Sequence, residues 1–155
     1  MKLSVIVPVL NDSEALENLA ASLSTQKNIE FEVIVVNGGN PDSTESHFSK
    51  SICEENRFRY FESQAGRGRQ MNIGRLHARA EHFLFLHADS QFSSELQLCD
   101  AIAAIQIAEI STPCIAGHFG LQFQTQDRRL RFGLGFLEKK SNLNRKMQQM
   151  EIKGF

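Results

Sequence analysis

A short apolar run in the middle of the chain ends abruptly at a histidine and a carboxylate. Residues 83–86 are Phe-Leu-Phe-Leu, and His87, Ala88 and Asp89 follow directly. This pattern is typical of a buried strand that delivers polar side chains to a site at its carboxyl end. A hard divalent cation such as Mg²⁺ or Mn²⁺ is often held by one or two carboxylates together with substrate phosphates. Asp89 is therefore a candidate for holding such a cation against a diphosphate.

His87 lies two residues before Asp89, and alternate residues of an extended strand point to the same side. We expect His87 to be either a second metal ligand or a donor to phosphate. The structural alternative is that Asp89 caps the following turn and that the hydrogen bonds of His87 are satisfied within the fold. Taken alone, the tripeptide favours this alternative. The other polar loops of the chain reverse the preference, so that a ligand-binding role is favoured.

The segment Gly66-Arg67-Gly68-Arg69 has the composition of an anion-binding loop. Glycines let the backbone approach a ligand closely, and free N–H groups at a helix start attract anions. The two arginines add forked donors with fixed positive charge. A flexible loop with solvated arginines explains the segment equally well. It is not a dinucleotide fingerprint, because the third glycine is missing, and the chain contains no P-loop sequence.

Strands and helices alternate along the chain, and their order determines where these polar groups lie. Strands are expected at residues 3–9, 32–36, 58–61, 83–86 and 114–123, of which the first two and the run at 83–86 have the pattern of buried strands. Helices are expected to start at Asn11, at Asp42, at Gly66 to Gly68 and at Ser93 or Ser94, and residues 126–150 are expected to be mostly helical. This order predicts an α/β fold with a mostly parallel sheet sandwiched by helices. Ligands of such sheets bind beyond the carboxyl ends of the strands, where the polar groups stand.

Charge is distributed unevenly between two parts of the chain. The net charge is -1, but residues 128–155 carry eight Lys or Arg residues and two Asp or Glu residues, a net charge of +6. We expect residues 1–127 to form one α/β domain and residues 128–155 to form a basic, amphipathic tail that is helical. An anionic partner, a membrane surface or a homodimer contact would suit this tail, and a solvated helix face is the equal alternative.

Several other classes of protein are not expected. No segment has the roughly 20 apolar residues of a membrane span, and the apolar run at the N-terminus is too short for a signal peptide. We therefore expect a cytoplasmic protein, peripheral to the membrane if the tail binds there. The cysteines are far apart, which predicts neither a disulfide framework nor a zinc site. Hydrolase and zinc-protease signatures do not occur, and no nucleic acid is expected as a partner.

Four segments, in the right order, resemble glycosyltransferase family 2, whose members have the GT-A fold. They are residues 4–12, similar to the family's opening strand; 33–44, similar to its second strand and DGGS-type loop; 66–74, similar to its G-R-x-x-Q-M-N-x-G segment; and 86–90, at the place of its D-x-D metal motif, here with His first. Together with the strands around them, the segments cover residues 3–123.

The resemblance implies a Rossmann-like GT-A fold, a nucleotide-diphospho-sugar donor, a divalent metal (Mn²⁺ or Mg²⁺) and transfer of the sugar to an acceptor hydroxyl. It assigns Asp89 to the metal and the diphosphate, with His87 beside it. Its remaining donor-binding positions are Pro8, Asp12, Asn37, Gly38, Arg67, Arg69 and Asn72. From the residues alone, Asp12 is either a helix cap or a ligand contact, and Asp42 is expected to be a helix cap.

Two features depart from the family's pattern. Asn37 stands where the family usually has an acid; it keeps hydrogen-bonding ability without the charge, and its alternative role is turn formation with Gly38. The family's acceptor half and catalytic carboxylate lie further along, but only Glu138 and Glu151 follow Asp127 here. We therefore expect the acceptor half and the catalytic base to be lacking. The alternative to an active glycosyltransferase is a non-catalytic or truncated nucleotide-binding module.

Overall fold

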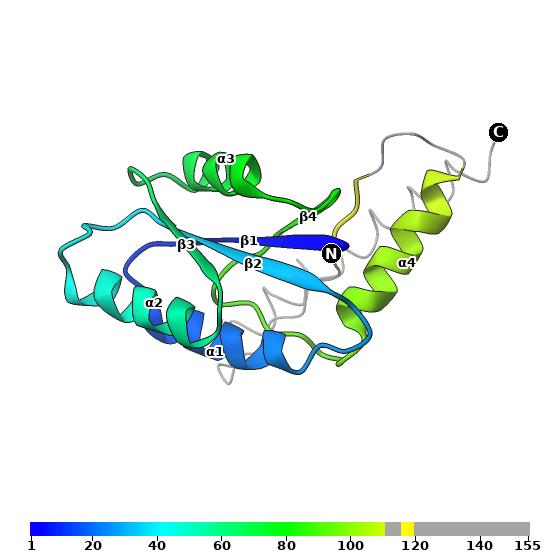
Figure 1. Cartoon of the computed structure of the whole chain (residues 1–155), viewed down its shortest axis with the longest axis horizontal. Helices are drawn as coiled ribbons and strands as arrows, with labels where there is room; N and C mark the ends of the chain where they lie inside the picture. Colours follow the sequence, from blue (N-terminus) through cyan, green and yellow to red (C-terminus); the bar gives the residue numbers. More distant parts are fainter. Residues whose placement is uncertain (111–115, 120–155) are drawn as a thin grey trace, which may run out of the picture. The chain divides into compact units, whose positions relative to one another are not determined.

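The computed structural model of the protein describes residues 1–110 and 116–119. The chain divides into two compact units, Met1–Pro113 and Cys114–Phe155. The first unit is built on a four-stranded parallel sheet with the strand order β3-β2-β1-β4 (Figure 1). The strands are β1 (Leu3–Val9), β2 (Phe31–Asn37), β3 (Arg59–Glu62) and β4 (His82–Phe85). The predicted α/β fold with a parallel sheet is confirmed.

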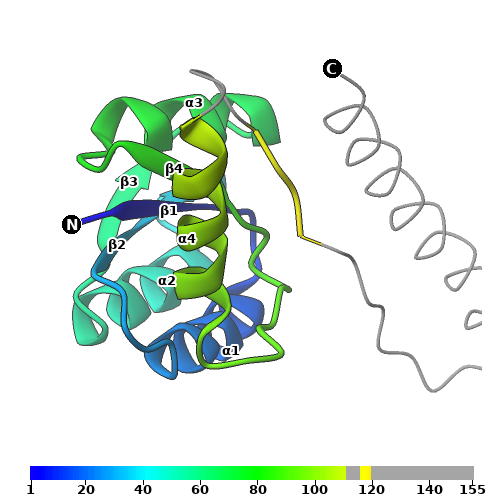
Figure 2. The same ribbon diagram turned by 90° about the vertical axis from the view of Figure 1, so that its right-hand side faces the viewer.

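The two central strands, β1 and β2, form the core because both are continuous apolar runs covered on both faces. Their residues Val5, Ile6, Ile34 and Val35 are completely buried. The helices α1 (Ser13–Ser24) and α2 (Thr44–Glu55) lie on one face of the sheet, and α3 (Arg67–His77) lies on the other (Figures 1 and 2). The last helix of the first unit is α4 (Gln97–Glu109).

The helix α1 presents the apolar face that its spacing predicts. Leu16, Leu19 and Leu23 are buried, and Ala20 lies among them. On the opposite face of the sheet, α3 comes unusually close to β1. A Cβ atom at Gly74 would lie 2.3 Å from Cγ2 of Ile6, so only glycine allows this approach.

The helices α1 and α2 each begin one residue later than predicted. The cap of α1 is Asp12 and not Asn11; an Asp12 carboxylate oxygen accepts a hydrogen bond from the Ala15 N–H at 3.2 Å. Asn11 has a φ of 50° and forms the turn before the helix. The cap of α2 is Ser43 and not Asp42, because the Ser43 hydroxyl accepts a hydrogen bond from the backbone N–H of Ser46, at 3.2 Å.

Two further boundaries were predicted wrongly. The helix α4 begins after Leu96, without a side-chain cap, and not at Ser93 or Ser94. Ser93 instead donates its backbone N–H to Gln97 Oε1 at 2.9 Å. The helix α3 ends at His77 and not near residue 80, since Ala78 has extended angles.

Little of the second unit falls within the described residues. Residues 116–119 belong to no regular element, so the expected strand at 114–123 is absent there, and its other residues lie outside the described part. The tail 128–155 also lies outside it, so the tail and the boundary after residue 127 stay predictions. Of the helices that the structure describes, none has the length and apolar character needed to cross a bilayer.

Candidate functional site

The strand order places the candidate site between β1 and β4. From β1 the sheet extends to β2 on one side and to β4 on the other, so the order of the strands reverses there. In open parallel sheets, ligands bind in the crevice beyond the carboxyl ends of the strands at such a reversal. The segments that leave these strand ends are residues 10–12 and 86–89.

Pro8 marks the point at which β1 and β4 separate. The Leu86 N–H donates to the Ile6 carbonyl at 3.0 Å, so the next bond of a regular parallel ladder would run from the N–H of residue 8 to the Leu86 carbonyl. Proline has no N–H, and the pairing of the two strands accordingly ends at Ile6 and Phe85. No described residue donates a hydrogen bond to the Leu86 carbonyl. Beyond this point β1 and β4 are not paired, and we refer to the region between residues 10–12 and 86–89 as the crevice.

The residues after β4 form a turn. It is closed by a hydrogen bond from the Ser90 N–H to the His87 carbonyl at 3.1 Å, and Ala88 is buried within it. Because the chain turns here, strand alternation does not place His87 and Asp89 on one side, and their joint role stays a prediction. Both side chains are exposed. Neither makes a side-chain hydrogen bond to the described residues, and no turn-capping bond from Asp89 occurs among them. The carboxylate is therefore available to a ligand.

The loops after β1 and β2 contact each other at the strand ends. A Cβ atom at Gly39 would lie 2.6 Å from Oδ1 of Asn11, which shows how closely the two loops approach. The Gly38 N–H donates to the Val9 carbonyl at 2.9 Å. Asp12 is exposed, and one of its oxygens caps α1. These two loops lie together at the carboxyl ends of β1 and β2.

Asn37 points into the protein. It is 1% exposed, and its Nδ2 donates to Ser46 Oγ at 2.6 Å and to Tyr60 Oη at 3.0 Å. Its Oδ1 accepts a hydrogen bond from the Gly39 N–H at 3.0 Å. Burial raises the pKa of Tyr60 above its ordinary value, against the opposing effect of the bond from Asn37. This geometry favours the turn-forming role of Asn37 over direct contact with a ligand.

The start of α3 suits an anion. Gly66 precedes the helix with a φ of 141°, a conformation that favours glycine, and no side chain caps the helix start. The first turn carries no acidic residue, so the positive end of the helix dipole is not neutralised. Arg67 and Arg69 are exposed there, and Arg69 Nη1 donates to Gln64 Oε1. Asn72 is also exposed, later in the helix.

One residue of the site was missed by sequence reasoning. Gln70 is 2% exposed, and its Nε2 donates to the Val9 and Val36 carbonyls at 2.7 and 2.8 Å. The available signal was its spacing from Gly74, since residues four apart share a helix face and this face packs on the sheet.

The donor atoms at the crevice fit a metal ion only in part. No group of three or more His, Cys, Asp or Glu side chains is placed to hold a metal within the described residues. A Mg²⁺- or Mn²⁺-type site in which substrate phosphates and water supply most ligands needs only one or two carboxylates, and Asp89 offers one. The described residues do not match a site formed by protein ligands alone.

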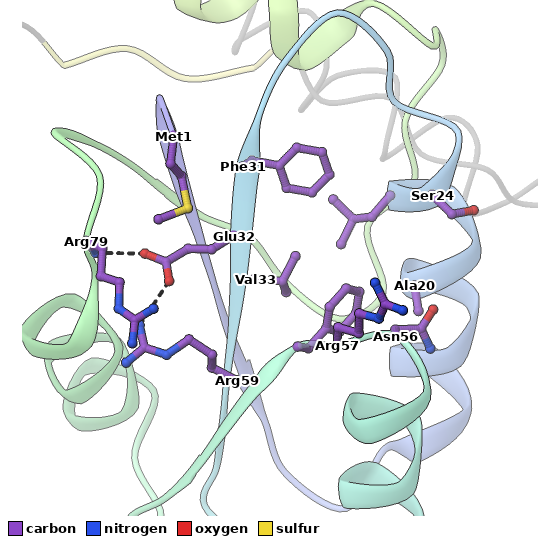
Figure 3. A pocket seen from close by; sticks show the side chains of 12 residues that line it. Met1, Ala20, Ser24, Phe31, Glu32, Val33, Asn56, Arg57, Arg59 and Arg79 are labelled. Carbon is purple, nitrogen blue, oxygen red and sulfur yellow. Dashed lines mark hydrogen bonds and ion pairs between the residues drawn. The ribbon is translucent and has the colours of Figure 1, made fainter.

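A pocket of about 500 Å³ lies at the opposite, amino end of the strands (Figure 3). Glu32 lines it and binds Arg59 in an ion pair at 2.9 Å and the Arg79 N–H at 2.7 Å. Burial alone would raise the pKa of Glu32. Hydrogen bonds from Ser4, Arg79 and Arg59 and the charge of Arg59 hold the pKa below its ordinary value. This carboxylate is already engaged, so we place the candidate site at the carboxyl ends.

Comparison with known proteins identifies the family. The fold is that of GT-A nucleotide-sugar enzymes. Residues 4–153 match the sequence profile of glycosyl transferase family 2, and the chain belongs to this family.

Two characterised relatives are longer proteins, and only part of each matches this chain. Dolichyl-phosphate beta-glucosyltransferase of Saccharomyces cerevisiae is 29% identical over an alignment of 117 residues, and the match covers 67% of this chain and 35% of the relative. The teichoic acid poly(glycerol phosphate) polymerase of Staphylococcus epidermidis is 27% identical over an alignment of 96 residues, and the match covers 60% of this chain and 13% of the relative. The chain thus spans about a third or less of these proteins.

Solved structures agree with the fold. S. aureus TarS (residues 1–349) in complex with UDP-GlcNAc is 32% identical, with a TM-score of 0.56 over 69% of this chain and 32% of that protein. A mannosyltransferase from Pyrobaculum calidifontis in complex with GDP-Man and Mn²⁺ is 24% identical, with a TM-score of 0.57 over 65% of this chain and 31% of that protein.

Proposed function

We propose that this chain binds a nucleotide-diphospho-sugar donor at the carboxyl edge of its sheet and takes part in transfer of the sugar to an acceptor hydroxyl. The observation that carries the proposal is the reversal of strand order between β1 and β4, with the exposed carboxylate of Asp89 in the turn that follows β4. The similarity to TarS, which was solved with UDP-GlcNAc, supports this class of donor.

Each side of the crevice suits one part of the donor. The loops after β1 and β2, with Asp12 and Gly38, would contact the nucleoside. The exposed Arg67 and Arg69 at the start of α3 would bind the diphosphate, since guanidinium groups and a free helix start both favour phosphate. Asp89 would lie beside the same diphosphate, where two like charges repel unless a cation lies between them.

Asp89, with His87, would hold a divalent cation that the diphosphate also coordinates. When bound, such an ion would neutralise the charge that develops on the departing nucleoside diphosphate. The residues of this chain would fix the donor for attack at its anomeric carbon by orienting both ends of the diphosphate.

Calorimetric titration tests donor binding directly. A panel of UDP- and GDP-linked sugars would be added to the wild type with and without Mn²⁺, and we expect heat for at least one donor and tighter binding with the metal. Asp89→Asn should remove the metal dependence. Asp100→Asn, which changes an exposed acid in the first turn of α4, should behave like the wild type. No heat from any donor in either condition would refute the proposal.

Transfer needs a separate measurement, because the chain spans only part of its relatives. Release of nucleoside diphosphate from the bound donor would be followed with and without candidate hydroxyl acceptors. Release that depends on an acceptor and disappears in Asp89→Asn supports an active transferase. Tight binding without release supports the alternative, a nucleotide-binding module.

A further inference from the structure

A single buried amide joins the two central strands at their carboxyl ends. Gln70 lies in the first turn of α3 and is 2% exposed, which is unusual for a glutamine. Its Nε2 donates one hydrogen bond to the Val9 carbonyl at 2.7 Å and one to the Val36 carbonyl at 2.8 Å. Val9 ends β1, and Val36 is the penultimate residue of β2.

The orientation of this amide is fixed by its partners. Both acceptors are carbonyl oxygens, so only the NH₂ group can face them; the reversed amide would place three oxygens together. The space is also closed from the other side, because a Cβ atom at Gly38 would lie 2.9 Å from Gln70 Cδ. The Gly38 N–H donates to the same Val9 carbonyl at 2.9 Å. Gln70, Val9 and Gly38 therefore form one cross-link between the two strands.

The cross-link lies next to the loops that the proposed function assigns to the donor. A carbonyl oxygen has two lone pairs and can accept a second hydrogen bond beside its ladder bond. Gln70 supplies such a bond to the carbonyls of Val9 and Val36, just before the loops that carry Asp12 and Gly38. It also lies one turn beyond Arg67, so the same side chain ties the start of α3 to both strands.

We propose that Gln70 is a positioning residue of the donor site, which holds the β1 and β2 loops and the start of α3 in one geometry. The inference rests on the proposed function, since it assigns the donor to these loops. Gln70 itself does not need to touch the donor. Its loss lets the strand ends separate, so a ligand that bridges the loops must pull them together again and binds more weakly.

Two variants of similar size test the proposal through donor affinity. Gln70→Met keeps the volume and removes both hydrogen bonds, which should raise the donor Kd by roughly 5- to 150-fold. Gln70→Glu keeps the shape but places a carboxylate against two carbonyl oxygens. Its defect relative to the wild type should shrink from about pH 8 to about pH 5, because burial raises the pKa of a carboxyl and the protonated acid can donate one bond. Gln106→Glu, an exposed change on α4, is the matched control.

A purely structural role predicts a different outcome. Both Gln70 variants would then lose thermal stability but bind the donor within about twofold of the wild type at a temperature where they are folded, and that result overturns the proposal.

Amide hydrogen exchange tests the cross-link without any donor. Exchange at Gly38 should be faster in Gln70→Met than in the wild type, whereas exchange at Val7, in the middle of β1, should not change. If the wild type binds no donor, the proposed function fails, and the cross-link is judged on this exchange alone. An unchanged rate at Gly38 overturns the cross-link itself.

Discussion

Replacing Pro8 by alanine should close part of the crevice. The Leu86 N–H already donates to the Ile6 carbonyl, and proline at residue 8 has no N–H for the next ladder bond. In Pro8→Ala that N–H is restored and can donate to the Leu86 carbonyl. We expect the β1–β4 pairing to extend by one bond and the donor to bind more weakly, because the mouth of the crevice narrows.

Two opposing terms determine the effect on stability. The new backbone hydrogen bond should contribute about 0.5–1.5 kcal/mol. Loss of the proline ring increases the freedom of the unfolded chain and costs about 0.4–1 kcal/mol. Pro41→Ala, in the exposed loop after β2, increases the freedom of the unfolded chain in the same way but adds no hydrogen bond. We therefore expect Pro8→Ala to be more stable than Pro41→Ala by about 0.5–1.5 kcal/mol, even if it differs little from the wild type.

Urea unfolding measures this difference, and amide exchange reports the bond itself. The N–H of the alanine at position 8 should exchange slowly, like its neighbours in β1, and calorimetry should show weaker donor binding. Rapid exchange at that amide, together with equal stabilities of the two proline variants, would refute the reasoning. The crevice would then owe its opening to some feature other than Pro8.

Three further substitutions test contacts that stabilise the sheet and the loops around the site. Gly74→Ala places a methyl group against Ile6 and should lower the free energy of unfolding by about 1–3 kcal/mol, measured in urea; full stability would contradict the close approach of α3. Asn37→Asp buries a carboxylate in place of an amide that donates to two hydroxyls and should cost about 1–3 kcal/mol, whereas the exposed Asn40→Asp should cost little. Glu32 has a folded-state pKa below its ordinary value of 4.5, so its contribution to stability is present above that pH and is lost as the pH falls below it. The stability difference between the wild type and Glu32→Gln should therefore shrink in acid, and a difference independent of pH would exclude this contribution.

The two central strands were predictable because buried parallel strands are continuous apolar runs, whereas β4, expected to be buried, has Phe83 and Phe85 exposed. The predicted limits of β1 agree with the structure, and β2 differs by one residue at each end. The buried face of α1 followed from the spacing of its leucines. These features depend on local pattern alone, and so did the expectation that polar loops gather at the carboxyl ends of the strands.

Helix starts were less predictable because neighbouring residues compete to cap them. Asn11 and Asp12 are both good caps, as are Asp42 and Ser43. At β1 the outcome depends on the other loop, since Asn11 contacts Gly39 and has a φ of 50°. A contact between segments so distant in sequence leaves no local signal.

The direction of polar side chains was the least predictable feature, and it changes how the site is understood. Asn37 and Gln70 are the polar residues most deeply buried at the strand ends, and the donors of both are used within the protein. Arg67 and Asp89 are exposed, and neither has a side-chain hydrogen bond to the described residues. A buried amide with its donors satisfied can stabilise a loop but has little left to offer a ligand, whereas an exposed, unengaged charge can bind one. The presence of Asn37 where the family usually has an acid therefore affects mainly the structure of the loop. In the proposed function, the positive charge that meets the diphosphate would come from Arg67 and Arg69 on α3, and Asp89 in the turn after β4 would meet it through a divalent cation.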